Sequence, residues 1–131
     1  MQLKTYVVED NPIIRDNLIA TLEELAGVTT VGTAETEKEG IEWLTSDSNA
    51  WDLGIVDLFL KQGTGLGVVS ACKKRLPTQK IIVLSNYATP DVRKQCVLLG
   101  ADAVFDKSTE IDELLEYCTN LSRSFKLHQC C

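Results

Sequence analysis

Apolar runs rich in β-branched residues alternate along this chain with segments in which apolar residues recur at helical spacing. The runs predict five strands, at residues 3–9, 28–34, 53–57, 80–85 and 103–107. The segments between and after them predict five helices, at about residues 12–26, 37–45, 66–75, 90–100 and 109–121. Regular alternation of strands and helices is typical of βαβ units. The pattern therefore predicts an α/β domain built on a parallel sheet.

Local signals mark the beginnings of these helices. Asn11 is a strong cap for the first helix because Pro12 occupies the first helical position. Residues 36–39 have the spacing of a capping box, and Ser108 or Thr109 is expected to cap the last helix. The apolar face expected for the first helix comprises Ile14, Leu18, Leu22 and Leu25. The face expected for the last helix comprises Ile111, Leu114, Leu115, Cys118 and Leu121.

Four of the strands end in polar or charged residues. These residues are Glu9, Asp10, Asp57, Ser85 and Lys107. In open parallel sheets the carboxyl ends of the strands meet at one edge, where ligands bind. Carboxylates gathered there repel one another unless a cation neutralises them, and Mg²⁺ is the abundant divalent ion that prefers oxygen ligands. Each residue alone also suits a turn, a helix start or a solvated surface, but the full set predicts a site for a divalent cation and a phosphoryl group.

The order and spacing of these five positions resemble the receiver domain of two-component response regulators. The resemblance covers essentially the whole chain and implies one domain, 1–131, with its core at about residues 3–122 and a tail at 123–131. It also implies a flavodoxin-like fold, in which a doubly wound five-stranded parallel sheet of order 2-1-3-4-5 is covered by five helices.

The resemblance further implies the role of each site residue. Asp57 would be the nucleophile that takes a phosphoryl group from the phosphohistidine of a histidine kinase or histidine phosphotransfer protein. Lys107 and Ser85 would bind that group. The implied Mg²⁺ ligands are Asp10, Asp57, the Phe59 backbone carbonyl and, through water, Glu9.

The sequence departs from the family pattern at several positions, among them Ser108, Val104, Asn86 and Lys61, the last of which stands where a proline is usual. Ser108 replaces the proline that many members carry after the lysine, so we expect a trans peptide bond before it, because a cis bond not preceding proline costs about 2.5–4 kcal/mol. Val104 replaces an aromatic residue that commonly acts as a switch, and Phe105 should face the other side of its strand. We therefore expect signalling to rest on the loop at residues 86–90 and on the helix that follows it.

Bulky residues flank the expected phosphoryl site, and an apolar residue stands at its rim. Asn86, Tyr87 and Phe59 should hinder an in-line water, which predicts a long-lived acyl phosphate. Ile13 and Asn17, with Asp16 beside them and Ile14 facing the core, form the surface expected to dock a helical histidine donor. Acidic residues of the last helix are expected to be solvated surface: Glu110, Asp112, Glu113 and Glu116.

Composition narrows the classes of function. With 131 residues and a net charge of −6, the chain fits one domain and lacks the basic surface needed for direct nucleic-acid binding. Neither a membrane span nor a signal peptide is evident, so we expect a cytoplasmic protein that does not bind membranes. The five cysteines lack disulfide or zinc spacing. Cys72, Cys96 and Cys118 are expected to be buried, whereas Cys130 and Cys131 read as an oxidation-prone tail.

The interpretation that unites these features is a Mg²⁺-dependent phosphoacceptor that changes its surface for a downstream protein target. We expect no enzymatic activity beyond self-phosphorylation and slow self-dephosphorylation. One alternative is the receiver part of a transcription regulator without its helix-turn-helix output, and another is an unphosphorylated interaction module. A phosphatase with an aspartyl nucleophile is a further alternative, although the residue two places after Asp57 is Phe59 rather than a second acid.

Overall fold

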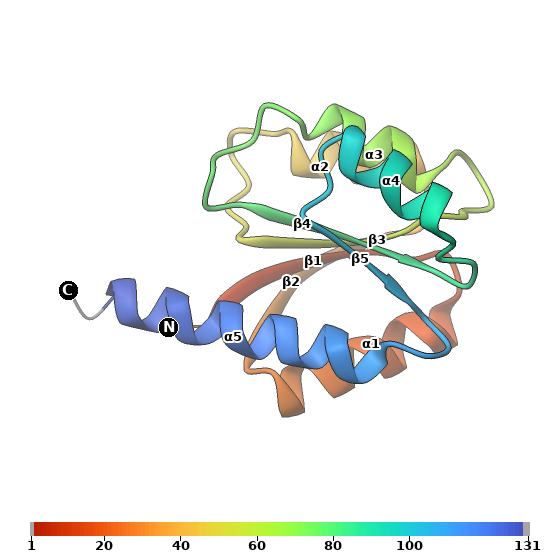
Figure 1. The fold of residues 1–131 in the computed structure, drawn as a ribbon. Helices are drawn as coiled ribbons and strands as arrows, with labels where there is room; N and C mark the ends of the chain where they lie inside the picture. Colours follow the sequence, from red (N-terminus) through yellow and green to blue (C-terminus); the bar gives the residue numbers. More distant parts are fainter. Residues whose placement is uncertain (1, 130–131) are drawn as a thin grey trace.

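Five parallel strands form the centre of the molecule (Figure 1). The computed structural model describes residues 2–129, and side chains as far as residue 124. The strands are β1 (Leu3–Val8), β2 (Val28–Ala34), β3 (Leu53–Asp57), β4 (Lys80–Ser85) and β5 (Ala103–Asp106). Their order across the sheet is β2-β1-β3-β4-β5. This topology confirms the doubly wound, flavodoxin-like sheet expected from the sequence.

Helices cover both faces of the sheet. They are α1 (Pro12–Leu25), α2 (Glu37–Leu44), α3 (Gly65–Ala71), α4 (Pro90–Leu98) and α5 (Ile111–Gln129). Figure 1 shows α1 and α5 on one face and α2, α3 and α4 on the other. Because crossovers between parallel strands are right-handed, α1, which leads from β1 outward to β2, lies on one face, and α2, α3 and α4, which lead across the sheet in the opposite direction, lie on the other. Within residues 2–129, the helices fall short of the length and apolar character needed to cross a lipid bilayer.

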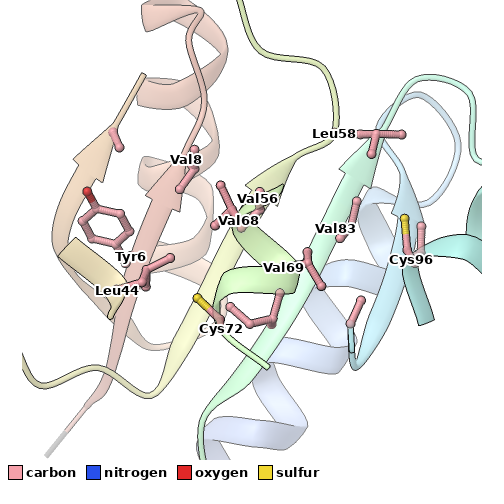
Figure 2. Packing of buried hydrophobic residues seen from close by; sticks show 14 of the residues in the cluster. Tyr6, Val8, Leu44, Val56, Leu58, Val68, Val69, Cys72, Val83 and Cys96 are labelled. Carbon is pink, nitrogen blue, oxygen red and sulfur yellow. The ribbon is translucent and has the colours of Figure 1, made fainter. Parts of the chain in front are cut away.

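Two apolar layers form the core, one on each face of the sheet. Consecutive residues of the central strands point in opposite directions, so Val56 packs toward α2, α3 and α4 while Ile55 packs toward α1 and α5. Figure 2 shows the first layer, in which Val68 and Val69 of α3 meet Val56 and Val83 of the sheet. Because β3 and β4 are buried on both faces, their sequences are continuously apolar rather than alternating.

The structure confirms the predicted helix starts at α1 and α2. The Asn11 side chain accepts hydrogen bonds from the backbone of Ile13 (3.0 Å) and Ile14 (3.1 Å). The Thr36 hydroxyl accepts from the Glu39 backbone N–H at 3.2 Å, which is one of the two bonds of a capping box, and it also donates to the Glu39 carboxylate at 3.1 Å. These bonds satisfy N–H groups that lack partners within the first turn of a helix.

Two local predictions were wrong. Helix α3 ends at Ala71 instead of residue 75, because residues 72–75 form tight turns and the Arg75 guanidinium binds the Cys72 carbonyl at 3.0 Å. Neither Ser108 nor Thr109 caps α5. Both donate backbone N–H groups to the Asp106 carboxylate, at 2.8 and 3.2 Å, and the helix begins two residues later.

The apolar face of α1 is narrower than predicted. Leu22 is fully buried and Leu18 packs against the core, but Leu25 is exposed at the end of the helix. The predicted inner face of α5 is confirmed, with Leu114 and Cys118 completely buried. Cys72 and Cys96 are also buried free thiols, whereas Cys130 and Cys131 lie outside the described residues.

Candidate functional site

Three carboxylates meet at the carboxyl end of the sheet. Glu9 and Asp10 directly follow β1, and Asp57 is the last residue of β3, which pairs with β1. One oxygen from each carboxylate lies within 4.8 Å of the others. Glu9 and Asp57 are buried, so their charges are poorly screened by water. The parallel register of two adjacent strands therefore concentrates negative charge at one point.

Lys107 supplies a positive charge to this cluster from the end of β5. Its ammonium lies 2.5 Å from Glu9 Oε1 and 2.9 Å from Asp57 Oδ2. Burial lowers the pKa of Lys107, but its bonds to Glu9 and Asp57 outweigh this effect and leave the pKa above its ordinary value. Burial raises the pKa of Glu9, and the bond from Lys107 opposes the rise. Three carboxylates and one ammonium leave a formal charge of −2.

The β3–α3 loop, residues 58–64, is tied to the acidic cluster. The Lys61 backbone N–H donates to Asp10 Oδ2 at 2.7 Å, and the Phe59 N–H donates to Asp57 Oδ1 at 3.4 Å. The loop ends at Gly65, where an added Cβ would lie 2.3 Å from the Asp57 carbonyl oxygen. Glycine at this position allows α3 to approach the end of β3 closely.

Ser85 is buried at the end of β4. Its Oγ accepts a hydrogen bond from the Tyr87 backbone N–H at 3.0 Å, which leaves the hydroxyl proton for donation to another group. The Ser85 carbonyl accepts from the Lys107 N–H at 2.9 Å, so the two predicted phosphoryl-binding residues are held together through the backbone.

The predicted gate and switch residues lie around this cluster. Asn86, Tyr87 and Phe59 are all exposed in loops that follow the ends of β4 and β3. Val104 is buried beneath α4, and Phe105 points to the other face, where its ring meets Tyr117 edge-on at 5.8 Å between centroids. The opposite orientation of these neighbours confirms the prediction from strand alternation, and the peptide bond after Lys107 is trans as predicted.

The start of α1 forms the rim of the site. Ile13 and Asn17 are exposed. The prediction that Ile14 faces the core was wrong, because its side chain is 42% exposed. The Ile14 side chain lines a groove of about 260 Å³ between α1 and α5. The groove is lined by Ile14, Asn17, Leu18, Thr21, Leu84, Lys107, Ile111, Leu114 and Leu115.

One prediction about the last helix was wrong, because Glu110 forms an ion pair that was not predicted. Glu110 was expected to be solvated, but its Oε1 accepts from the Arg93 guanidinium at 2.5 Å and from the Asp106 N–H at 2.9 Å. Arg93 was not among the functional residues predicted from the sequence. The two residues are 17 positions apart on different elements, so periodicity carries no signal for the contact.

Comparison with known proteins assigns the family. The model of the response regulator receiver domain matches residues 5–119. Among curated relatives, the response regulator VraR of Staphylococcus saprophyticus is 24% identical over 88% of this chain and 54% of the relative. A cyclic di-GMP phosphodiesterase of Thermotoga maritima is 28% identical over 93% of this chain and 32% of the relative. This chain therefore spans about half the length or less of these two relatives.

Solved structures show the same fold. The receiver domain of the Francisella response regulator 1452 superposes with a TM-score of 0.80 at 22% identity, over 95% of this chain and 99% of that one. The receiver domain of NarL from Mycobacterium tuberculosis gives 0.79 at 18% identity, over 93% and 97%. The chain belongs to the response regulator receiver domain family, whose members act in two-component signalling.

Proposed function

We propose that Asp57 is a phosphoacceptor that takes a phosphoryl group from a phosphohistidine in a Mg²⁺-dependent reaction. The observation that carries this proposal is the ammonium of Lys107 held between the buried carboxylates of Glu9 and Asp57. A cation in this position neutralises part of the charge that a phosphoryl group would bring to Asp57. The donor would be a histidine kinase or a histidine phosphotransfer protein.

The donor set fits a hard divalent cation. All three carboxylates present oxygen atoms, within 4.8 Å of one another, and the formal charge of −2 matches one such ion. Asp10 and Asp57 would hold it directly, together with the Phe59 carbonyl, and Glu9 would act through water. When bound, Mg²⁺ supplies charge neutralisation for the oxygens of the transferring group.

Asp57, Lys107 and Ser85 would have separate roles in the transfer. One Asp57 carboxylate oxygen bonds to phosphorus as the bond from phosphorus to the donor histidine nitrogen breaks, which yields an acyl phosphate and a free histidine. Lys107 places its ammonium beside Asp57 Oδ2, where it can bind a phosphoryl oxygen. Ser85 retains a proton to donate to another phosphoryl oxygen. Positioning and charge supply the catalysis, since phosphoryl transfer needs little else from the protein.

The groove between α1 and α5 favours a helical donor. The groove opens beside Lys107, and its lining is mainly apolar. The exposed side chain of Ile13 lies on α1, one of the two helices that form the groove. A few apolar anchors of this kind carry most of the affinity in protein interfaces. Replacing Ile13 by serine should therefore slow transfer from a histidine phosphotransfer protein more than transfer from a small phosphodonor.

Phosphorylation would shift the population of conformations at the surface formed by α4, β5 and α5 and so select a downstream protein. The proposal is tested by intact-mass spectrometry after incubation with a small phosphodonor, with Mg²⁺ or with a chelator, using Asp57→Asn as the control. A gain of one phosphoryl group that needs both Mg²⁺ and Asp57 supports it. A gain that persists in Asp57→Asn contradicts it.

A further inference from the structure

Arg93 on α4 joins three separate elements through one guanidinium group. Its Nε donates to the Ala88 carbonyl at 2.8 Å, in the β4–α4 loop. Its Nη1 donates to the Val104 carbonyl at 3.1 Å, in β5, and its Nη2 donates to Glu110 at the start of α5. The planar fork of arginine suits this arrangement, because it presents several N–H donors in fixed directions.

Glu110 and Asp106 extend these contacts to the β5–α5 turn. Glu110 accepts the Asp106 N–H at 2.9 Å, and the Asp106 carboxylate accepts the N–H groups of Ser108 and Thr109. Hydrogen bonds donated by Ser108 lower the pKa of Asp106, and the nearby Ala88 N–H contributes to the same shift. The turn therefore has a defined shape that depends on Asp106.

The two ends of this network are next to the two residues proposed to bind the phosphoryl group. Ala88 lies three residues after Ser85, in the loop where Ser85 Oγ accepts the Tyr87 N–H. Lys107 lies inside the turn, directly after Asp106. If Ser85 and Lys107 move toward a phosphoryl group, the β4–α4 loop that follows Ser85 and the β5–α5 turn that contains Lys107 must adjust.

We infer that Arg93, Glu110 and Asp106 form a clasp that holds the β4–α4 loop and the β5–α5 turn in the unphosphorylated arrangement and transmits a change at the site to α4. The inference rests on the proposed function of Asp57. The clasp would couple the site to α4 in a chain whose usual switch position holds Val104 instead of an aromatic residue. Arg93 binds the carbonyl of this same Val104. The Arg93 and Glu110 side chains are 38% and 27% exposed, so the clasp lies at the surface where a partner would read it.

Hydrogen–deuterium exchange of the full chain tests the clasp, with beryllofluoride and Mg²⁺ as the phosphoryl probe. The variants are Arg93→Ala, Arg93→Lys, which keeps the charge but not the three-way fork, and Glu110→Gln, which keeps an acceptor for the Asp106 N–H. Lys94→Ala, an exposed cation at the next position of α4, is the matched control. Urea unfolding establishes that each variant is folded.

In the wild type and in Lys94→Ala, the probe should speed exchange in peptides that cover residues 86–93 and 104–110. In Arg93→Ala these peptides should exchange rapidly without the probe and change little when it is added, with Arg93→Lys and Glu110→Gln intermediate. By reciprocity, Arg93→Ala should bind beryllofluoride at least about 5-fold more tightly, a typical coupling between sites.

Two results would overturn the inference, and they are distinguishable. If the wild type responds to the probe and Arg93→Ala matches it both before and after addition, the clasp does not couple the site to α4. If the probe binds neither protein and leaves exchange unchanged in both, the proposed phosphorylation of Asp57 fails and the coupling fails with it.

Discussion

Replacing Lys107 by methionine should destabilise the metal-free protein strongly. Methionine has a similar length, so the main loss is the ammonium that lies 2.5 Å from Glu9 and 2.9 Å from Asp57. The three side chains are only 12%, 3% and 9% exposed, so water cannot replace the lost cation. The substitution therefore leaves two buried carboxylates facing each other without a counter-charge.

Two estimates of the loss agree. Hydrogen bonds to charged groups contribute about 1.5–3 kcal/mol each, and two of them disappear, which gives about 3–6 kcal/mol. Removing one partner of a buried ion pair costs about 3–5 kcal/mol in other proteins. We expect the free energy of unfolding in a chelator to fall by about 3–5 kcal/mol at pH 7, as measured by urea denaturation.

Mg²⁺ should restore more stability to the Lys107→Met variant than to the wild type, because the variant's site carries one more negative charge and binding to the folded state alone stabilises it. Lys61→Met is the matched control, since the Lys61 side chain is exposed and only its backbone binds Asp10. A loss below about 1 kcal/mol, or one no larger than that of the control, would refute the view that Lys107 compensates a buried acidic cluster.

Three further predictions concern the core, the clasp and the gate. Leu114→Ala, at a fully buried position of α5, should lower the free energy of unfolding by about 2–5 kcal/mol in urea, and a loss below about 1 kcal/mol would contradict the packing. The bond from Arg93 depresses the pKa of Glu110, so its stabilising effect is present above the ordinary pKa of 4.5 and is lost as pH falls further. Glu110→Gln should therefore be less stable than wild type at pH 7, the difference should shrink as pH is lowered below 4.5, and a constant difference would oppose this assignment. The double variant Phe59→Asn, Tyr87→Glu should lose its acyl phosphate faster than wild type in a mass-spectrometric time course, because smaller or polar groups admit water. An unchanged or longer lifetime would exclude gating by these side chains.

Most of the fold and the acidic cluster follow from local patterns in the sequence. The strand order was expected only from the family resemblance. Each strand is a short β-branched run, and the side chains at its end lie at one edge of the sheet because the strands are parallel. Local pattern alone is therefore enough to assign Asp57 and Glu9 to one edge of the sheet. The capping residues Asn11 and Thr36 were also predictable, because a cap contacts only the first turn of its own helix.

The errors arise where tertiary packing, or a competing local hydrogen bond, decides between equivalent local choices. Ile14 continues the apolar repeat of α1, but its side chain lines the groove between α1 and α5 and is 42% exposed. Ser108 and Thr109 are residue types that commonly cap helices. The Asp106 carboxylate accepts both of their backbone N–H groups, and the helix begins two residues later. The partnership of Arg93 with Glu110 depends on how α4 lies against β5, which no single-segment pattern encodes.

We propose that Asp57, and neither of the two carboxylates beside it, accepts the phosphoryl group. Treating the phosphorylated protein with borohydride reduces an acyl phosphate to an alcohol, which converts that residue to homoserine if it is an aspartate. Peptide mass spectrometry then locates the modified residue. If Asp57 is the acceptor, homoserine appears at position 57 only, and only after incubation with both phosphodonor and Mg²⁺. Modification at Asp10 or Glu9, or none in a protein that has gained a phosphoryl group, would contradict it.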